Sequence, residues 1–399
     1  MSIFEELINE SCPNGVKFVP LKEIAEMKRG SSLTKAKAKD GPYPVISGGR
    51  KPAFFCDEYN REGEIITIAG SGAGAGFVQY WNERIYANDC FTIKGKKGLL
   101  SKYLYYYLSN IQEKIYDTKK GGGVPHVHIS DVEFFRIPVP PLEVQEEIVR
   151  ILDTFTELTA ELTAELTAEL TARKKQYEYY LDKFYGGSLE EMMKLKNHGN
   201  YKICQLSEIG NFTRGKRFVK ADSEGLIDGV PCIHYGELYT HYGVSAVKSK
   251  SFVTEGVANN LRFAKEKDVV IVGAGENNID IGIGVAWFGK DVAVHDACYI
   301  YKHNMDPKYI SYYLRTSIYH NQIKKYVSRG KICSISAHGI GKALIPIPSM
   351  EEQRRIVDIL DRFDALCNDI STGLPAEIEA RQKQYEYYRD KLLTFKEMS

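Results

Sequence analysis

Two segments of this chain, residues 137–183 and 345–391, are copies of one another. They align without a gap at a constant offset of 208, and 25 of the 47 aligned positions are identical. The motif Q-Y-E-Y-Y at residues 176–180, for example, recurs at residues 384–388. A chain built from two copies of one element is expected to act on a target with two parts.

Outside these segments the duplication is weaker. K-R-G at residues 28–30 resembles T-R-G at 213–215, and K-Y-L-Y-Y-Y-L at 102–108 resembles K-Y-I-S-Y-Y-L at 308–314. Elsewhere the halves diverge almost completely, so variable and fixed parts alternate. We predict a first globular domain at 1–136 with a short N-terminal helix, a helical spacer at 137–185, a second globular domain at 186–344 that begins with a linker at 186–200, and a C-terminal helical region at 345–399.

The charge is unevenly distributed along the chain. Residues 15–136 and 200–344 each hold 19 Lys and Arg against 13 Asp and Glu, whereas 141–185 holds 5 against 10 and 349–395 holds 7 against 10. Two equally basic globular parts joined by acidic segments suggest two surfaces for a polyanion. Ordinary scatter would explain either part taken alone; the recurrence favours the functional interpretation.

The fixed segments are typical of long helices. Pro140 and Pro141 suit the first turn of a helix, and apolar residues then recur every three, four or seven positions without Gly or Pro until Gly186. That predicts a helix of about 45 residues, roughly 65 Å long. The second copy should break or kink at residues 373–375, before Ala376. We therefore predict an α+β protein: two pseudo-symmetric globular α/β domains separated by two long helices packed as an antiparallel coiled coil.

A second repeat lies within the first helix. T-A-E-L at residues 159–162 recurs at 163–166 and 167–170. Because four residues exceed the helical period of 3.6, each unit turns the line of leucines by about 40° and adds about 6 Å of rise. One interpretation is a low-complexity spacer with no further meaning. The other is a ruler, since gaining or losing a unit would shift and rotate one globular domain relative to the other.

Basic residues cluster at matched places in the two globular parts. Phosphate contacts need such cations, and although a solvated loop explains any single cluster, the duplication favours DNA contact. Arg, Lys and His can also read base edges. The candidate DNA-binding residues are Lys28, Arg29, Lys35, Lys37, Lys39, Lys119, Lys120 and His126 in the first part, and Arg214, Lys216, Arg217, Lys220, Arg329 and Lys331 in the second.

The sequence offers little for catalysis. The glycine-rich stretch at residues 70–76 follows a predicted strand, but it lacks the spacing of a dinucleotide fingerprint and precedes another strand, so we predict a tight hairpin. No nucleotide-binding or zinc-hydrolase motif is present, and the eight cysteines show no metal-ligand spacing. The tyrosines near 105 and 312 have the spacing of a packed helix, so we expect them in the core. A binding protein without metal or catalytic residues is predicted.

The N-terminus, M-S-I-F-E-E-L, carries acids where a secretory signal needs basic residues. No stretch approaches the roughly 20 apolar residues that span a bilayer. We expect a cytoplasmic protein.

The two fixed segments and the T-A-E-L units together make the pattern familiar. I-P-[VI]-P, then I-V-x-I-L-D-x-F and K-Q-Y-E-Y-Y in each copy, resembles the specificity (S) subunit of type I restriction-modification systems, in the subfamily with T-A-E-L repeats. The resemblance implies two target recognition domains that read an asymmetric, bipartite DNA site, and helices that dock two methyltransferase subunits, with restriction subunits joining them.

The resemblance further implies that this chain is not an enzyme and holds no cofactor, because S-adenosylmethionine, ATP and Mg²⁺ belong to the partner subunits. No base-contacting residue can be carried over. A coiled-coil scaffold that binds only proteins is the competing hypothesis, and it leaves the matched basic clusters unexplained. The residues expected in the spacer and docking helices are Gln145, Ile148, Leu152, Phe155, Leu162, Leu166 and Tyr177 in the first copy, and Gln353, Ile356, Leu360, Phe363 and Tyr385 in the second.

Overall fold

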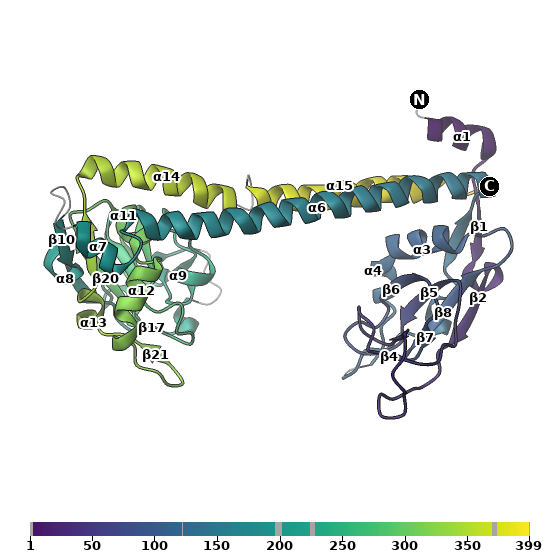
Figure 1. Cartoon of the computed structure of the whole chain (residues 1–399), viewed down its shortest axis with the longest axis horizontal. Helices are drawn as coiled ribbons and strands as arrows, with labels where there is room; N and C mark the ends of the chain where they lie inside the picture. The colour runs from purple at the N-terminus through teal and green to yellow at the C-terminus, as the bar shows by residue number, and fades with distance from the viewer. Residues whose placement is uncertain (1–2, 122, 196–201, 224–227, 369–372, 399) are drawn as a thin grey trace. The chain divides into compact units, whose positions relative to one another are not determined.

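The computed structural model describes residues 3–121, 123–195, 202–223, 228–368 and 373–398. The chain divides into two compact units, Met1–Glu165 with Ile378–Ser399, and Leu166–Glu377. Figure 1 labels their helices and strands. Each unit has its own apolar core, so each is described by itself.

The first unit is built on a four-stranded antiparallel sheet in the order β2-β8-β5-β6. A three-stranded sheet, β4-β3-β7, and a two-stranded ladder, β1-β9, complete it. Its strands are β1 (Lys17–Pro20), β2 (Ala25–Arg29), β3 (Tyr43–Ile46), β4 (Phe54–Cys56), β5 (Glu64–Ala69), β6 (Val78–Asn82), β7 (Tyr86–Ala87), β8 (Cys90–Gly95) and β9 (Arg136–Val139). Its short helices are α1 (Ile3–Ser11), α2 (Leu21–Ile24), α3 (Ser101–Asn110), α4 (Gln112–Tyr116) and α5 (Ile129–Val132).

The second unit repeats this plan with insertions. Its main sheet has the order β11-β20-β16-β18-β13, beside the smaller sheets β14-β12-β19-β15, β10-β22 and β17-β21. Its strands are β10 (Lys202–Gln205), β11 (Gly210–Arg214), β12 (Val230–Ile233), β13 (Ser245–Ala246), β14 (Ser251–Val253), β15 (Phe263–Ala264), β16 (Val269–Val272), β17 (Ala274–Gly275), β18 (Gly284–Trp287), β19 (Val292–Val294), β20 (Cys298–His303), β21 (Cys333–Ser334) and β22 (Leu344–Ile347). Its short helices are α7 (Leu189–Leu195), α8 (Leu206–Ile209), η2 (Lys220–Asp222), α9 (Glu237–Thr240), α10 (Glu255–Ala258), α11 (Pro307–Tyr313), α12 (Ser317–Ile323), η3 (Lys324–Tyr326) and α13 (Ala337–Gly341).

The fixed segments form the long helices α6 (Leu142–Phe184), α14 (Met350–Asn368) and α15 (Leu374–Leu393). The mixed α+β class, the two α/β halves and the long packed helices are therefore confirmed. The predicted interruption of the second copy is also present, with Pro375 inside the first turn of α15, where its missing N–H costs no hydrogen bond. The helix α7 lies within the stretch that was predicted as a linker. Among the described helices none is long and apolar enough to cross a membrane.

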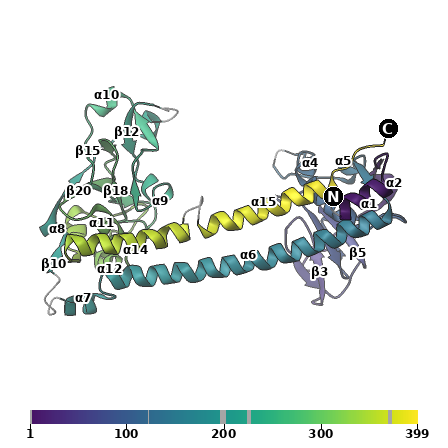
Figure 2. The same cartoon turned by 90° about the horizontal axis from the view of Figure 1, so that it is seen from above.

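Each core takes residues from both copies of the fixed segment. The first core includes Ile148 and Leu152 of α6 and Leu393 of α15, and Figure 2 shows these two helices side by side over the first unit. Thr156 of α6 also lies within hydrogen-bond distance of Tyr385 of α15 (Oγ1 to Oη, 3.0 Å). The end of one copy therefore completes the unit in which the other copy begins.

The same holds in the second unit. Its core includes Ile356 and Leu360 of α14 together with Leu181 of α6. The rings of Tyr180 in α6 and Phe363 in α14 stack, with centroids 5.7 Å apart. The pairing of residue 156 with 385, and of 180 with 363, means that the two copies run in opposite directions, as predicted.

A buried glutamine fixes each globular part to its long helix. Gln145 at the start of α6 is fully buried; its Oε1 accepts from the amide of Leu100 (2.9 Å), and its Nε2 donates to the carbonyls of Gly98 (3.0 Å) and Pro140 (2.8 Å). Gln353 repeats this in the second unit, accepting from the amide of Asp306 and donating to the carbonyl of Pro348. Buried amide groups need all their partners, so the helix can start in only one position.

About two helical turns further on, an aspartate makes the second part of this junction. Asp153 accepts from Lys102 Nζ (2.7 Å) and Tyr106 Oη (2.6 Å) of α3. Asp361 accepts from Lys308 Nζ and Tyr312 Oη of α11 at the same two distances. These tyrosines are buried, which confirms their prediction as core residues, and burial followed by the hydrogen bond to the carboxylate raises the pKa of each hydroxyl. We call the glutamine and aspartate contacts of each unit the junction clamp.

We expect Gln145→Leu to destabilise the first unit by about 2 kcal/mol, because the buried carbonyl of Pro140 loses its partner and the amide of Leu100 and the carbonyl of Gly98 lose a hydrogen bond to the helix. Urea unfolding of the full chain, followed by hydrogen exchange to resolve the two units, measures this. Glu146→Leu, at the exposed neighbouring position, is the matched control. Equal stability of the two variants would show that the clamp does not hold the unit together.

Candidate nucleic-acid interface

Three separate segments of the first unit meet at the end of strand β2. Arg29 ends that strand, Gly70 follows strand β5, and His126 closes a loop whose backbone pairs with Lys120 and with Ser71. Together they line a cleft of about 540 Å³. The structure thus brings together two of the predicted DNA-binding residues, Arg29 and His126, which lie 97 positions apart in the sequence.

The cleft holds donors and acceptors in a defined arrangement. Nη2 of Arg29 lies 3.4 Å from Nδ1 of His128, and the ring of His128 stacks on that of His126 with 4° between the planes. Asp89 lines the same cleft and accepts from the hydroxyl of Ser71. Guanidinium and imidazole groups can contact guanine or phosphate, and a carboxylate can accept from the cytosine amino group.

A glycine lets the backbone pass beside the cleft. A Cβ atom on Gly30 would lie 2.1 Å from the carbonyl oxygen of Asn88, and one on Gly215, its counterpart, 2.2 Å from that of His295. No side chain fits at either position, so the shared R-G pair of the two halves has a structural cause. It places the arginine at the same point of both sheets.

A second arginine contacts the end of this strand, and no pattern in the sequence predicts it. Arg61 donates from Nη2 to the carbonyl of Arg29 (2.7 Å), and Arg262 donates from Nη1 to the carbonyl of Arg214 (2.6 Å). The two lie at different distances from their partners along the chain, so no constant offset links them. Only the folded sheets show that they are equivalent.

The second unit builds the corresponding surface from matched elements. Arg214 ends strand β11 and donates from Nε to the carbonyl of Asp296 (2.7 Å). Arg329 and Lys331 lie in a loop that ends at strand β21. This strand pairs with β17, whose first residue, Ala274, donates a backbone hydrogen bond to the carbonyl of Ala297. The strand after the glycine-rich turn pairs antiparallel with the strand before it in both units, so the hairpin prediction is confirmed.

An aromatic cluster supports the basic loop of the second unit. Phe218 is buried, and its ring lies against those of His234 (4.6 Å between centroids) and His295 (5.2 Å). Burial lowers the pKa of His295, which favours its neutral form. The cluster anchors the segment directly after Lys216 and Arg217, whose side chains remain exposed.

The other candidate residues differ in whether their basic side chains already pair with an acidic or aromatic residue. Lys28 lies in strand β2 and not in a loop as predicted, and it pairs with Glu26 (2.6 Å). Lys119 lies over the ring of Tyr116, and Lys120 pairs with Asp131. Exposed side chains that form no such ion pair with any described residue belong to Lys35, Lys37, Lys39, Lys216, Arg217, Arg329 and Lys331. The side chain of Lys220 is outside the described part of the structure.

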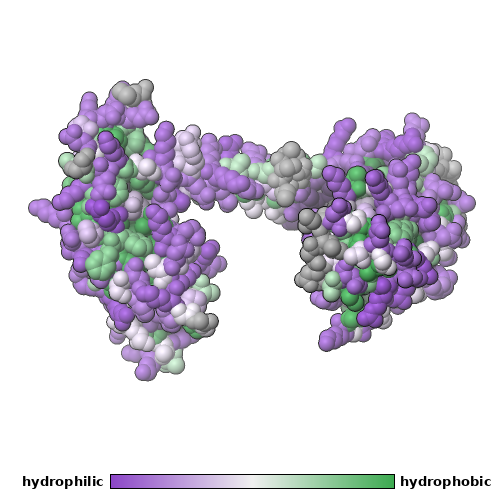
Figure 3. Space-filling view, turned by 180° about the vertical axis from the view of Figure 1, so that it is seen from behind, coloured by the Kyte–Doolittle hydropathy of each residue, from purple (hydrophilic) through white to green (hydrophobic). Residues whose placement is uncertain are grey.

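The residues expected in the docking helices are mostly turned inward. Gln145, Ile148, Leu152, Gln353, Ile356 and Leu360 are buried within their own units. A partner would therefore meet the exposed residues between them. Phe155, Leu162, Tyr177, Phe363 and Tyr385 are half-buried and Leu166 is buried. Figure 3 shows that the visible surface of both units is mainly hydrophilic, with small apolar patches. Within the described residues, no three His, Cys, Asp or Glu side chains gather as a metal site would require.

Comparison with known proteins gives a family. The model of the type I restriction modification DNA specificity domain matches the chain twice, at residues 13–172 and 198–380. The specificity subunit of the type I restriction enzymes EcoR124I and EcoR124II from Escherichia coli is 31% identical over 429 residues, which cover 99% of this chain and 97% of that protein.

Solved structures have the same fold. A chain from a structure on complex assembly and conformational transition of the type I restriction-modification system matches with a TM-score of 0.69 at 16% identity, covering 96% of this chain and 98% of the other. The HsdS subunit from Thermoanaerobacter tengcongensis matches with a TM-score of 0.54 at 16% identity, covering 96% and 97%.

We expect Arg29→Gln and Arg214→Gln each to weaken binding of duplex DNA. Loss of one phosphate contact should lower the slope of log K against log salt by about 0.9, whereas loss of a base contact should lower affinity by about 1–3 kcal/mol for the preferred sequence alone. Fluorescence anisotropy between 50 and 200 mM salt measures both quantities. Arg150→Gln, an exposed arginine of α6 paired with Glu147, is the control. A protein-binding scaffold would show neither effect.

Proposed function

Because this chain belongs to the type I restriction-modification DNA specificity family, we propose that it reads an asymmetric DNA site in two halves, one with each unit. The observation that carries this proposal is the double match of the family model to a chain whose halves share their scaffold and differ in their loops. A shared scaffold presents two surfaces in the same way. Divergent loops then allow the two half-sites to have different sequences.

The family assigns this chain specificity and leaves catalysis to the methyltransferase and restriction subunits of the complex. S-adenosylmethionine and ATP belong to those subunits. We propose that residues 1–136 and 186–344 are the target recognition domains, and that 137–185 and 345–399 are the conserved helical regions. The cleft at Arg29 and the matched surface at Arg214 are the proposed sites of base and phosphate contact.

We further propose that the chain binds double-stranded DNA, two methyltransferase subunits and restriction subunits in the cytoplasm. Two equivalent helical regions support two copies of the same partner. Several exposed positions of these helices are identical in both copies, among them Lys175 and Lys383, and Tyr179 and Tyr387. Exposed residues are not required to match for folding, so their identity supports a common partner.

The T-A-E-L units place the chain, we propose, in the subfamily that uses them to set the distance between half-sites. The whole repeat lies within α6, a single helix. Leu158 is 54% exposed, whereas Leu166 is 8% exposed. The line of leucines thus turns around the helix, as a four-residue period requires. One unit rotates the chain by about 40°, close to the roughly 35° twist of one base pair.

Deleting residues 163–166 should shorten the unread spacer of the DNA site by one base pair and leave both half-sites unchanged. Mapping methylated adenines in a host that carries the variant measures this. Thr163→Ala, which keeps the length of α6, should leave the spacer as it is. An unaltered spacer after the deletion, or a changed half-site, would refute the ruler.

A fragment of residues 1–185 should pair with itself and direct methylation to a palindrome of the first half-site. In the full chain, Asp390 of α15 accepts from Asn110 in the first unit (3.0 Å), and the matched Asp182 of α6 accepts from the amide of Ser317 in the second (2.8 Å). The α6 helix of a second copy can therefore replace α15. Asp182→Ala should weaken pairing of the fragment by about tenfold, the effect of one charged hydrogen bond. A fragment that stays monomeric with the methyltransferase present would refute the equivalence of the halves.

A further inference from the structure

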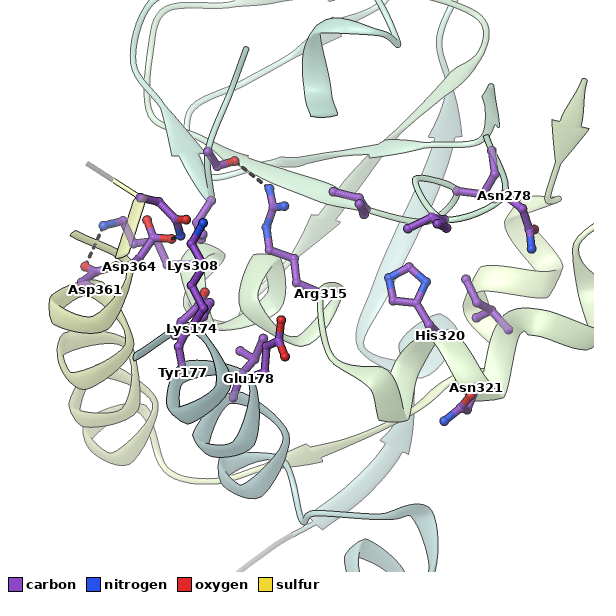
Figure 4. A pocket seen from close by; sticks show the side chains of 18 of the residues that line it. Lys174, Tyr177, Glu178, Asn278, Lys308, Arg315, His320, Asn321, Asp361 and Asp364 are labelled. Atoms are coloured by element: carbon purple, nitrogen blue, oxygen red, sulfur yellow. Dashed lines mark hydrogen bonds and ion pairs between the residues drawn. The ribbon is translucent and has the colours of Figure 1, made fainter. Parts of the chain in front are cut away.

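A large cavity lies inside the second unit, away from its proposed DNA-binding residues. It has a volume of about 1020 Å³, is open to solvent on one side, and is lined by α6, α14, the junction of α11 and α12, and the loop at residues 278–283 (Figure 4). Helix α6 contributes Tyr177 and Glu178, and α14 contributes Asp361 and Asp364. The opposite wall is aliphatic, with Ile281, Ile283 and Ile323, and with Ile279 at 74% exposure.

The guanidinium of Arg315 lines this cavity without a counter-ion. Its Nη2 donates to the carbonyls of Gly243 (2.7 Å) and Gly284 (3.2 Å). Its Nε is shielded from solvent and has no hydrogen-bond partner among the described residues. No carboxylate described in the structure lies within ion-pair distance of Arg315. Asp361 is paired with Lys308, and Asp364, which lines the same cavity, acts on the guanidinium only from a longer distance. Burial lowers the pKa of Arg315, which reflects the cost of holding this cation away from water.

The first unit has no arginine at the matched position of its helix α3. The motif that ends at Leu314 matches the one that ends at Leu108, so Ser109 takes the place of Arg315. An arginine reaches this region of the first unit from α15 instead. Arg389 donates to the side chain of Asn110 (2.9 Å) and lies over the ring of Tyr385 (5.7 Å). Among the described residues, an arginine directly after this helical motif is thus a feature of the second unit.

We propose that this cavity receives a carboxylate side chain from one of the two methyltransferase subunits, with Arg315 as its anchor. The proposal rests on the proposed function, which supplies that partner. An unneutralised guanidinium calls for an anion, and the surrounding wall of isoleucines and Tyr177 calls for an apolar surface next to it. Arginine and tyrosine within an aliphatic rim are typical of the central contacts of protein interfaces. An inorganic anion would leave the exposed Ile279 uncovered.

The anchor makes the two docking sites unequal in strength. The partner bound at the second unit gains a charge-assisted contact that the first unit lacks. The two copies of the partner should therefore bind with different affinities, although the helices that they contact are duplicated. Occupancy by a carboxylate also removes the free-energy cost of the unpaired cation, so Arg315 contributes to the complex more than to the isolated chain.

The test compares Arg315→Met and Arg315→Lys with the wild-type full chain. Native mass spectrometry and titration with the methyltransferase subunit should show that Arg315→Met binds one copy normally and the other at least about tenfold more weakly, with Arg315→Lys in between. The isolated Arg315→Met chain should melt at the same temperature as wild type or higher, because an apolar side chain replaces a desolvated cation. Lys290→Met, at an exposed position between β18 and β19 and outside the docking helices, should change neither property.

Three results would overturn the proposal. Both copies could bind Arg315→Met as they bind wild type. The variant chain could melt at a clearly lower temperature and lose both copies together, which would make Arg315 a structural residue. Inorganic phosphate could raise the melting temperature of wild type and not of Arg315→Met, which would assign the cavity to a small oxyanion. If the wild-type chain binds no methyltransferase subunit, the proposed function is refuted as well. The three results above differ from this one because in each of them the wild-type chain still binds the subunit.

Discussion

The junction clamp is the contact on which the rest of each unit depends. A buried glutamine, Gln145 or Gln353, can be satisfied only if the loop before α3 or α11 and the end of the preceding strand both lie against the start of the long helix. An aspartate about two turns later then fixes the rotation of the helix through a lysine and a tyrosine. Because unsatisfied buried polar groups are costly, these contacts define one orientation of helix and sheet.

This clamp explains why the duplicated residues lie where they do. The identical positions of the two copies include the glutamine, the aspartate and the apolar residues between them, all of which face the globular part of their own unit. The residues at the far end of the sheets, around Arg29 and Arg214, are under no such constraint beyond the glycine that follows each arginine. Because the junction with the long helix is fixed and the opposite end of each sheet is less constrained, the sequence of the recognition loops can change without altering the scaffold or the surface that its partner subunits contact.

Each unit is also composite, because both copies of the helical segment contribute to each core. The core of the first unit includes residues of the second helical copy, and the core of the second unit includes residues of the first copy. The halves of the chain are therefore mutually dependent in folding, although they are independent in what their loops present. Two departures from symmetry concern the helices: the T-A-E-L units of α6 have no counterpart in the second copy, and an arginine comes from the turn between α11 and α12 in one unit and from α15 in the other.

The sequence by itself determined the duplication, the long helices, the buried tyrosines, the hairpins at the glycine-rich turns and the family, because these depend on periodicity and on matching positions along the chain. Tertiary structure alone decided which basic residues gather in one cleft, which of them are already paired with an acid, and which docking-helix residues face inward. It also decided that Arg61 and Arg262 are equivalent and that Arg315 has no counter-ion. These facts depend on contacts between segments tens to hundreds of residues apart, at separations that differ between the two halves, so no repeat or spacing could reveal them.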